Sequence, residues 1–471
     1  MVFSSTTFLF AFLPLVLITY FIVPRVIKNA VLLIFSLVFY AWGEPVYVVL
    51  MLASITVAYI TGIFADKKRK PGCEKTAFIS MLFAVIWNIG LLLFFKYTDF
   101  FIINANNLFN TSFKILGLTL PIGISFYSFQ TLSYVIDVYR GEVRSQKNFL
   151  NLATYVTLFP QLIAGPIVRY QTIEDQLNSR KESISQFSRG IKRFAIGLGK
   201  KVILANNIGA LFAEISAASQ SELSVVSSWL GILAYTFQIY FDFSGYSDMA
   251  IGLGKMFGFD FLENFNYPYI SRSITEFWRR WHISLSTWFR DYVYIPLGGN
   301  RKGIARQCLN IMIVWFLTGF WHGANWNFIC WGLYFGVILL CEKLFLAKAL
   351  KKTPAVIQHI YSLLLIIVGW GIFAYEDTAD LIQNFKNLFG FGGLEFFNDK
   401  ALFWLANYAV TFIVLIIAST PLFRKLGEKL TLKAPVLYSC VLEPAAVAVL
   451  LIVSTAYLAS NSFNPFLYFR F

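Results

Sequence analysis

The sequence predicts an all-α, polytopic membrane protein with roughly 11 to 13 transmembrane or re-entrant helices around a central tunnel. Two observations on composition and pattern support this fold class. Of the 471 residues, 58% are hydrophobic and only 14% are charged. Soluble domains carry about 25% charged residues, so this composition excludes an ordinary soluble domain. The apolar runs are continuous instead of alternating, which excludes a β-barrel.

A membrane-spanning helix needs about 20 apolar residues, and such runs recur along nearly the whole chain. No segment of soluble-domain composition is long enough to fold separately, so residues 1–471 are expected to form a single integral-membrane domain. The first run lacks a basic segment before it and an obvious cleavage site, so we interpret it as a span and not as a signal peptide. The expected spans are Phe8–Val23, Ala30–Trp42, Val46–Ala65, Thr76–Phe95, Leu118–Tyr139, Phe149–Val168, Phe194–Ala217, Val225–Phe241, Asn310–Phe320, Trp326–Phe345, Ile360–Tyr375, Leu402–Ala418 and Leu437–Leu458.

Helix-breaking residues interrupt two of these spans. Pro121 and Gly123 lie in the fifth expected span, and Pro160 and Pro166 lie in the sixth. Broken helices are tolerated at membrane depth only where they are buried in protein or line a cavity. The breaks therefore favour a central tunnel, although an ordinary kink explains any single one equally well.

The net charge of +14 sits in short loops between the spans. Such loops follow the positive-inside rule, so we expect contact with the lipid bilayer and no nucleic-acid partner. The five cysteines are scattered and include no CxxC pair. This pattern predicts neither a disulfide framework nor a metal site, and we expect no permanently bound cofactor.

The segment 264–306 differs from the rest because it is too polar to span and rich in aromatic residues. We expect short amphipathic helices there, at the cytoplasmic interface. Arg279 and Arg290 carry guanidinium groups that suit phosphates, such as those of a coenzyme A thioester. The alternative, favoured for at least two of Arg279, Arg280, Arg290 and Asp291, is contact with lipid headgroups together with an internal pair between an arginine and the aspartate.

Two of the three histidines, His282 and His322, lie in or close after this segment. His322 is flanked by apolar residues, and an ionisable imidazole at membrane depth is costly unless it has a function. It can act as a general base in acyl transfer, while a buried histidine bonded to a carbonyl is an equally good interpretation. His282, at the polar interface, and His359, at the start of a span, are read as interfacial residues on physical grounds alone.

A transporter would explain intramembrane polar groups differently. Asp137, Asp242 and Asp248 are candidates for a proton relay, with Asp242 the strongest, although structural hydrogen bonding is the favoured interpretation. Among the serines, Ser284 is a conceivable nucleophile that has no local support in the sequence.

Several long motifs resemble those of the membrane-bound O-acyltransferases, and in particular their alginate-type O-acetyltransferase branch. They cover most of the chain in order. The matching segments are Pro121–Arg140, Phe159–Tyr170, Phe241–Gly258, Glu263–Ser271, Glu276–Arg301, Leu317–Trp331 and Asn464–Phe471.

The resemblance implies catalysis by His322, in a Trp-His-Gly motif, and a second signature histidine at His282. It also implies acetyl-CoA from the cytoplasm as the donor, an extracytoplasmic polysaccharide acceptor and a lipase-like partner acetyltransferase, in a bacterial cytoplasmic membrane. Alternatives are D-alanyl transfer to teichoic acid from a carrier-protein thioester, and a polysaccharide-export transporter or scaffold. The residues expected to line the substrate tunnel are Trp278, Arg279, Trp281, Arg290, Asp291, Trp321, Gly323 and Asn325.

The basic loops also predict the topology. Lys67–Lys70 and Arg424–Lys433 are expected in the cytoplasm, and the acidic segment Glu376–Lys400 outside. In a background without other cysteines, an impermeant thiol reagent should therefore label Asp380→Cys from outside and leave Lys68→Cys unlabelled. The reverse labelling would invert the predicted orientation.

Overall fold

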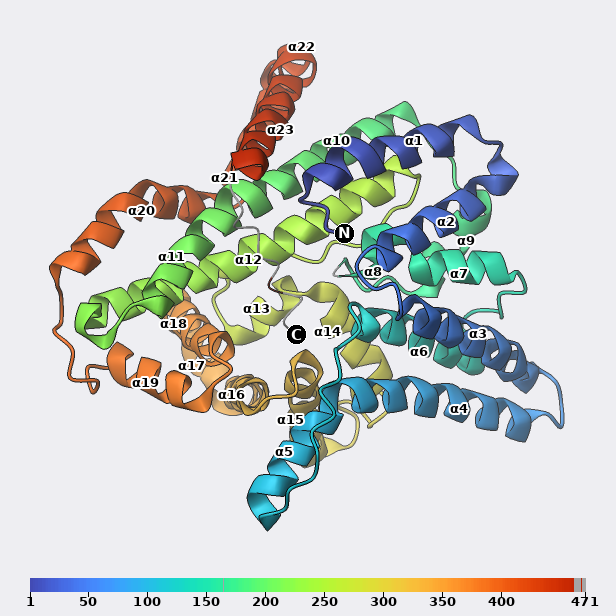
Figure 1. The fold of residues 1–471 in the computed structure, drawn as a ribbon, viewed down its shortest axis with the longest axis horizontal. Helices are drawn as coiled ribbons and strands as arrows, with labels where there is room; N and C mark the ends of the chain where they lie inside the picture. The colour runs from blue at the N-terminus through green and yellow to red at the C-terminus, as the bar shows by residue number, and fades with distance from the viewer. Residues whose placement is uncertain (164, 461–466, 468–471) are drawn as a thin grey trace. The chain divides into compact units, whose positions relative to one another are not determined.

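The computed structural model describes residues 1–163, 165–460 and 467, and no β-strand occurs in that part of the chain (Figure 1). The predicted all-α class is therefore confirmed. Except for Leu467, the tail motif Asn464–Phe471 lies outside the described residues. The chain forms two compact units, so the expectation of one domain stays a prediction. The first unit is Met1–Phe194 with Met249–Leu262, and the second is Ala195–Asp248 with Glu263–Phe471.

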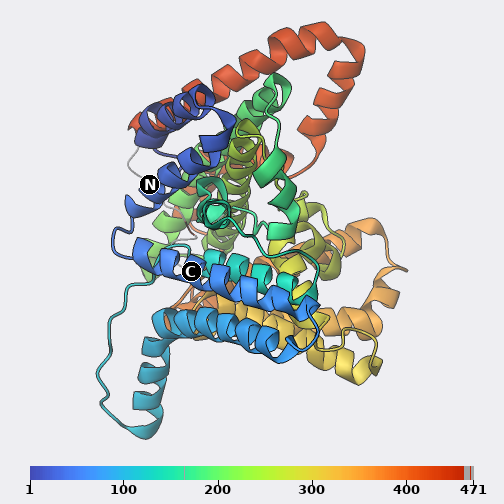
Figure 2. The same cartoon turned by 90° about the vertical axis from the view of Figure 1, so that its right-hand side faces the viewer.

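The first unit contains a core of three helices, α3, α4 and α6, which lie side by side (Figures 1 and 2). A methyl group on Gly62 of α3 would lie 2.8 Å from the ring of Tyr134 of α6, so the glycine permits this close approach. Thr131 of α6 donates a hydrogen bond of 2.8 Å to the Asn88 side chain of α4. The helices are α1 (Leu13–Ile22), α2 (Lys28–Ala41), α3 (Val48–Ala65), α4 (Glu74–Leu92), α5 (Thr98–Phe109), α6 (Ile124–Arg140), α7 (Phe149–Thr157), α8 (Phe159–Leu162) and α9 (Tyr170–Ser179).

Both predicted helix breaks are present in this unit. Gly123, with a φ of +76°, precedes α6, so the helix begins after the Pro121 turn and not at Leu118. The second break falls at Leu158, whose ψ of 107° separates α7 from α8. The backbone N–H of Phe159 donates to the Ser36 hydroxyl at 3.0 Å, which satisfies a group that the break exposes.

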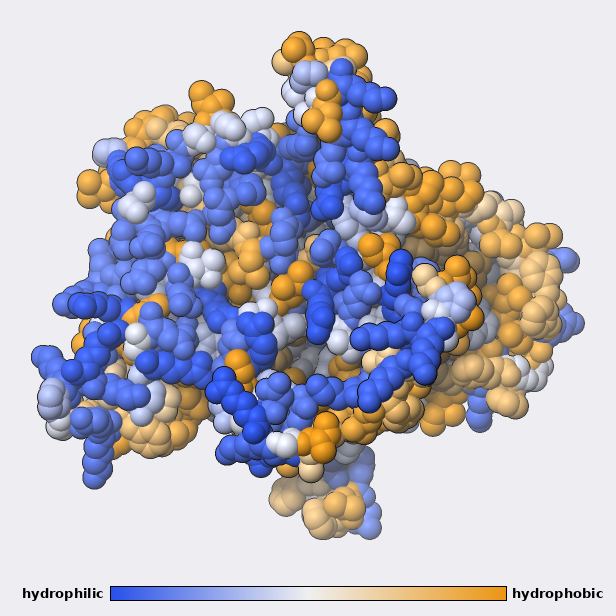
Figure 3. All heavy atoms as spheres, turned by 180° about the vertical axis from the view of Figure 1, so that it is seen from behind, coloured by the Kyte–Doolittle hydropathy of each residue, from blue (hydrophilic) through white to orange (hydrophobic). Residues whose placement is uncertain are grey.

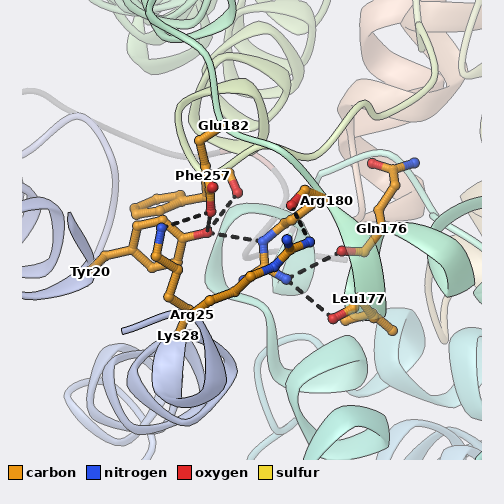
Figure 4. Close-up of polar contacts among 8 residues, drawn as sticks. All are labelled: Tyr20, Arg25, Lys28, Gln176, Leu177, Arg180, Glu182 and Phe257. Atoms are coloured by element: carbon orange, nitrogen blue, oxygen red, sulfur yellow. Dashed lines mark hydrogen bonds and ion pairs between the residues drawn. The ribbon is translucent and has the colours of Figure 1, made fainter. Parts of the chain in front are cut away.

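A partly buried polar cluster connects distant segments of the first unit (Figure 4). The Tyr20 hydroxyl of α1 accepts from Arg180 Nε at 2.9 Å and lies 2.5 Å from Glu182 and 3.0 Å from the carbonyl oxygen of Phe257. Lys28, at the start of α2, pairs with Glu182 at 3.1 Å. These polar groups therefore bond to one another, and the bonds connect α1 and α2 with the segment after α9 and with Phe257.

The second unit includes a tightly packed pair of helices, α15 and α16. A methyl group on Gly319 of α15 would collide with the carbonyl oxygen of Phe328 in α16, and one on Gly332 would collide with that of Trp315. Small residues allow such close backbone approach. Its helices are α11 (Asn206–Ala217), α13 (Ile274–Arg280), α14 (Ile283–Phe289), α15 (Gly303–His322), α16 (Trp326–Cys341), α17 (Ala347–Leu350), α18 (Ala355–Ala374), α19 (Thr378–Leu388), α20 (Asp399–Ala418), α21 (Leu422–Lys433), α22 (Pro435–Leu437) and α23 (Glu443–Ser460), while α10 (Ile184–Gly199) and α12 (Val225–Met256) contribute to both units.

Seven helical segments among the described residues are long and apolar enough to cross a membrane, which makes this a multi-pass membrane protein. Large apolar side chains on these helices are exposed, as expected for surfaces that face lipid, and they form hydrophobic areas in Figure 3. The predicted tunnel stays a prediction. The seven segments are Val48–Arg69, Glu74–Phe109, Gly303–His322, Trp326–Leu350, Ala355–Ala374, Asp399–Ala418 and Pro435–Ser460.

The contact between α15 and α16 can be tested with a matched pair of glycines. Gly319→Ala should destabilise the protein by about 1–3 kcal/mol, because the backbone carbonyl of Phe328 cannot move aside easily. Gly90→Ala in α4 meets nothing within 4 Å and should cause no loss. Thermal unfolding in detergent measures both, and equal stability of the two variants would refute this packing.

Candidate active site

The first element of the site is the junction between α13 and α14. Ser273 caps α13 by accepting a hydrogen bond of 3.0 Å from the Glu276 N–H, and Glu276 pairs with Arg280 one turn later at 2.9 Å. His282 follows with a φ of +46° and a ψ of +54°. This left-handed conformation is uncommon for residues other than glycine. The surrounding contacts must therefore hold His282 in place.

Asn264 provides those contacts from an earlier segment. Its side-chain oxygen lies 3.2 Å from His282 Nδ1 and accepts from the Ser284 N–H at 3.1 Å and the Ser284 hydroxyl at 2.9 Å. Its backbone oxygen accepts from the Ile283 N–H at 3.0 Å. Asn264 is fully buried, so these bonds replace those that water would make.

The same contacts define the state of the His282 ring. A backbone N–H can only donate, so the Asn264 atom that faces Ser284 is the oxygen, and His282 Nδ1 must carry the proton. Burial lowers the pKa of His282 to about 3, which keeps the ring neutral near neutral pH. Nε2 is then the nitrogen with a lone pair. Ser284 donates to Asn264, which gives no support to a role for Ser284 as a nucleophile.

The second element is the end of α15, where His322 is the last helical residue. Its ring packs edge-on against aromatic rings, with centroids 4.9 Å from Trp321, 5.1 Å from Trp331 and 5.3 Å from Phe373. Trp321 also lies 6.2 Å from the His282 ring. The two histidines thus share one aromatic neighbour, although 40 positions separate them in the sequence.

Both histidines line one cavity of about 270 Å³ within the second unit. Most of its wall is aromatic or aliphatic, whereas Arg279 and Arg290 are exposed and supply positive charge. An apolar cavity with a few convergent polar groups is the usual form of a small-molecule site. Six residues predicted from the sequence lie in its wall: Trp278, Arg279, Trp281, His282, Arg290 and His322.

Four other predicted residues lie outside that wall. Asp291 forms a two-point ion pair with Arg290, at 2.7 and 3.2 Å, which fits the alternative interpretation of that pair. Trp321 packs against the rings of both histidines, and Gly323 packs against the ring of Phe328. Asn325 caps α16 by accepting from the Trp326 N–H at 2.8 Å. These positions support the site's framework.

Sequence reasoning missed several cavity residues, and four of them lie on one face of α15. Thr318, Trp315, Val314 and Ile311 precede His322 by 4, 7, 8 and 11 residues. Side chains at this spacing share a helix face. Counting back from His322 would have found them. Asn264 gave no comparable signal, because its contact with His282 depends on the folded chain.

The relay candidates and the third histidine make structural contacts. Asp242 forms a buried ion pair of 2.6 Å with Lys201 and accepts from the Leu467 N–H at 3.0 Å. Asp248 pairs with Lys200 at 2.8 Å, and Asp137 is buried within α6 of the first unit. His359 Nδ1 lies 3.1 Å from the Ser271 carbonyl oxygen. No group of His, Cys, Asp and Glu that could hold a metal ion occurs in the described part of the chain.

The chain is similar to several known proteins. Residues 140–375, which include both cavity histidines, match the model of MBOAT, the membrane-bound O-acyltransferase family. The "Probable alginate O-acetylase AlgI" of Azotobacter vinelandii is 40% identical over 505 aligned residues, covering 100% of both chains. The "Peptidoglycan O-acetyltransferase" of Helicobacter pylori is 35% identical over 430 residues, covering 84% of this chain and 81% of that protein.

A more distant relative covers only half of the chain. The "Teichoic acid D-alanyltransferase" of Bacillus subtilis is 30% identical over 236 residues, or 48% of this chain and 59% of that protein. All of these names describe acyl transfer, so the predicted enzyme class, an O-acyltransferase, is confirmed.

The buried, neutral His282 predicts how stability depends on pH. Its pKa is about 3 in the folded protein and about 6.5 in an unfolded chain, so below pH 6.5 the unfolded state binds more protons. Stability should therefore fall as the pH drops from 7 to 5, by at most about 1.4 kcal/mol per pH unit from this residue. His282→Gln, which does not titrate, should show a shallower slope of melting temperature in detergent. Identical slopes would contradict a neutral, buried His282.

Proposed function

Because this chain belongs to the membrane-bound O-acyltransferase family, we propose that it moves an acetyl group from cytoplasmic acetyl-CoA toward an extracytoplasmic polysaccharide. The observation that carries this proposal is the cavity that His282 and His322 line together. The acetyl group would bind in this cavity, and the bulk of the coenzyme would remain outside it.

His322 is the general base in this proposal. Its imidazole takes the proton from the acceptor hydroxyl while that oxygen attacks the thioester carbonyl carbon. The tetrahedral intermediate then collapses, the carbon–sulfur bond breaks, and the proton passes to the departing thiolate. The C-terminal end of a helix favours the positive charge that His322 acquires during the transfer, and His322 ends α15.

His282 has a different role, because a ring with a pKa of about 3 is a weak base. Asn264 fixes its orientation, so that Nε2 can accept a hydrogen bond from a bound substrate or water. Arg279 and Arg290, which also line the cavity, would bind phosphates of the donor. Arg290 already forms an ion pair with Asp291, so Arg279 is proposed as the stronger phosphate ligand.

The proposal of a polysaccharide acceptor rests on similarity across the whole chain to the relative named for alginate. We propose that a lipase-like partner acetyltransferase completes the transfer outside a bacterial cytoplasmic membrane. D-alanyl transfer from a carrier-protein thioester remains the second candidate, favoured by the relative that matches 48% of the chain.

Purified protein in detergent, with its acceptor present, should release free coenzyme A from acetyl-CoA. His322→Ala should lower kcat roughly 10²–10⁴-fold, which is the usual contribution of a general base. His322→Gln should be equally slow, since glutamine keeps a polar group but takes up no proton near neutral pH. His282→Ala should act mainly through donor binding or folding, with a smaller loss of kcat.

His359→Ala is the matched control, because His359 contacts the backbone of Ser271 and lies outside the cavity wall. Near-normal turnover in His322→Ala together with an inactive His282→Ala would reverse the two roles. Activity with a D-alanyl carrier protein but none with acetyl-CoA would favour the second candidate function.

A further inference from the structure

The helix that supplies much of the cavity wall cannot hold itself in place. α13 has only seven residues, and three of them, Thr275, Trp278 and Arg279, line the cavity together with Trp281 at the C-terminal cap of the helix. Isolated helices of this length are unstable in water, so its position must come from contacts with other elements.

A single buried carboxylate makes four hydrogen bonds around the start of α13. Glu342 Oε1 accepts from the Ile274 N–H at 2.7 Å and from the Tyr361 hydroxyl at 3.2 Å. Glu342 Oε2 accepts from the Thr275 N–H at 2.8 Å and from the Thr275 hydroxyl at 2.6 Å. The residue is only 2% exposed, so these four donors take the place of water.

Glu342 also connects the two sides of the site. It directly follows α16, whose Trp331 packs against the His322 ring at 5.1 Å. Its carboxylate holds the first turn of α13, and Thr275 of that turn lines the cavity. A shift of Glu342 would therefore displace the arginine-bearing helix relative to the helix that supports His322.

We propose that Glu342 is a positioning residue for acyl transfer, which holds α13 so that Arg279 faces the donor. This inference rests on the proposed function, because the donor phosphates are what Arg279 would bind. The competing explanation is that Glu342 only stabilises the fold, and the two explanations differ in what a conservative substitution changes.

The Glu342→Gln variant distinguishes a positioning role from a purely structural role. Both carboxylate oxygens accept from two donors each, whereas a glutamine amide has one oxygen and one NH2 group. The NH2 group must therefore face donors, either those of Thr275 or those of Ile274 and Tyr361. Tyr361→Phe is the matched control, because it removes one bond to the same carboxylate and leaves all three bonds to α13.

The first measurement needs no activity. Hydrogen–deuterium exchange of the peptide covering 274–281 should accelerate in Glu342→Gln and stay at the wild-type rate in Tyr361→Phe. Unchanged exchange in Glu342→Gln would overturn the proposed anchoring of α13, whatever the protein catalyses.

The second measurement is kinetic, and it requires that the wild-type protein transfers acetyl groups. Glu342→Gln should raise the KM for acetyl-CoA about tenfold and change kcat by less than about twofold. Combined with Arg279→Ala, it should add little to the loss in kcat/KM, because both changes remove the same donor contact. If the two substitutions lower kcat/KM by factors that multiply, or if Glu342→Gln leaves the KM for acetyl-CoA unchanged, Glu342 only stabilises the fold. Absence of transfer in the wild type would instead refute the proposed function and leave the exchange result standing.

Discussion

The hydrogen bond between the Asn264 side-chain oxygen and His282 Nδ1 is the contact on which the candidate site depends. A buried polar group in an apolar, aromatic environment is costly unless it is hydrogen-bonded. This bond satisfies the Nδ1–H of His282 at the junction of α13 and α14. It fixes which nitrogen carries the proton, and it offsets the left-handed backbone of His282. The ring of Phe243, 4.7 Å away, then restricts the orientation of His282 further.

The same physical constraint explains the other side of the site. His322 is held by packing, since three aromatic rings surround it and the glycines of α15 and α16 bring the two helix backbones together. The buried carboxylate of Glu342 adds hydrogen bonds to this packing, because three of its four donors belong to α13. Close packing and hydrogen bonding therefore act together to keep both histidines at one cavity.

Much of this arrangement could be predicted from the sequence, because periodicity and composition report directly on membrane spans. The proline and glycine breaks before α6 and between α7 and α8 are local features, and the sequence located them. His322 stood out because an imidazole between apolar runs is rare. Asn264 and Glu342 did not stand out, since the partners of Glu342 lie 67 and 68 positions away and only the fold brings them together. Gly323 and Asn325 are among the residues expected to line the tunnel, and in the structure they make packing and capping contacts.

The central claim is that one cavity in the second unit brings an acyl donor to His322. A cryo-electron microscopy structure with an acetyl-CoA analogue, in which a thioether replaces the thioester, tests it most directly. We expect density for the acyl end inside the cavity, within hydrogen-bonding distance of His322, and density for the phosphates beside Arg279. An analogue bound elsewhere, with both histidines out of reach of its acyl end, would contradict the account.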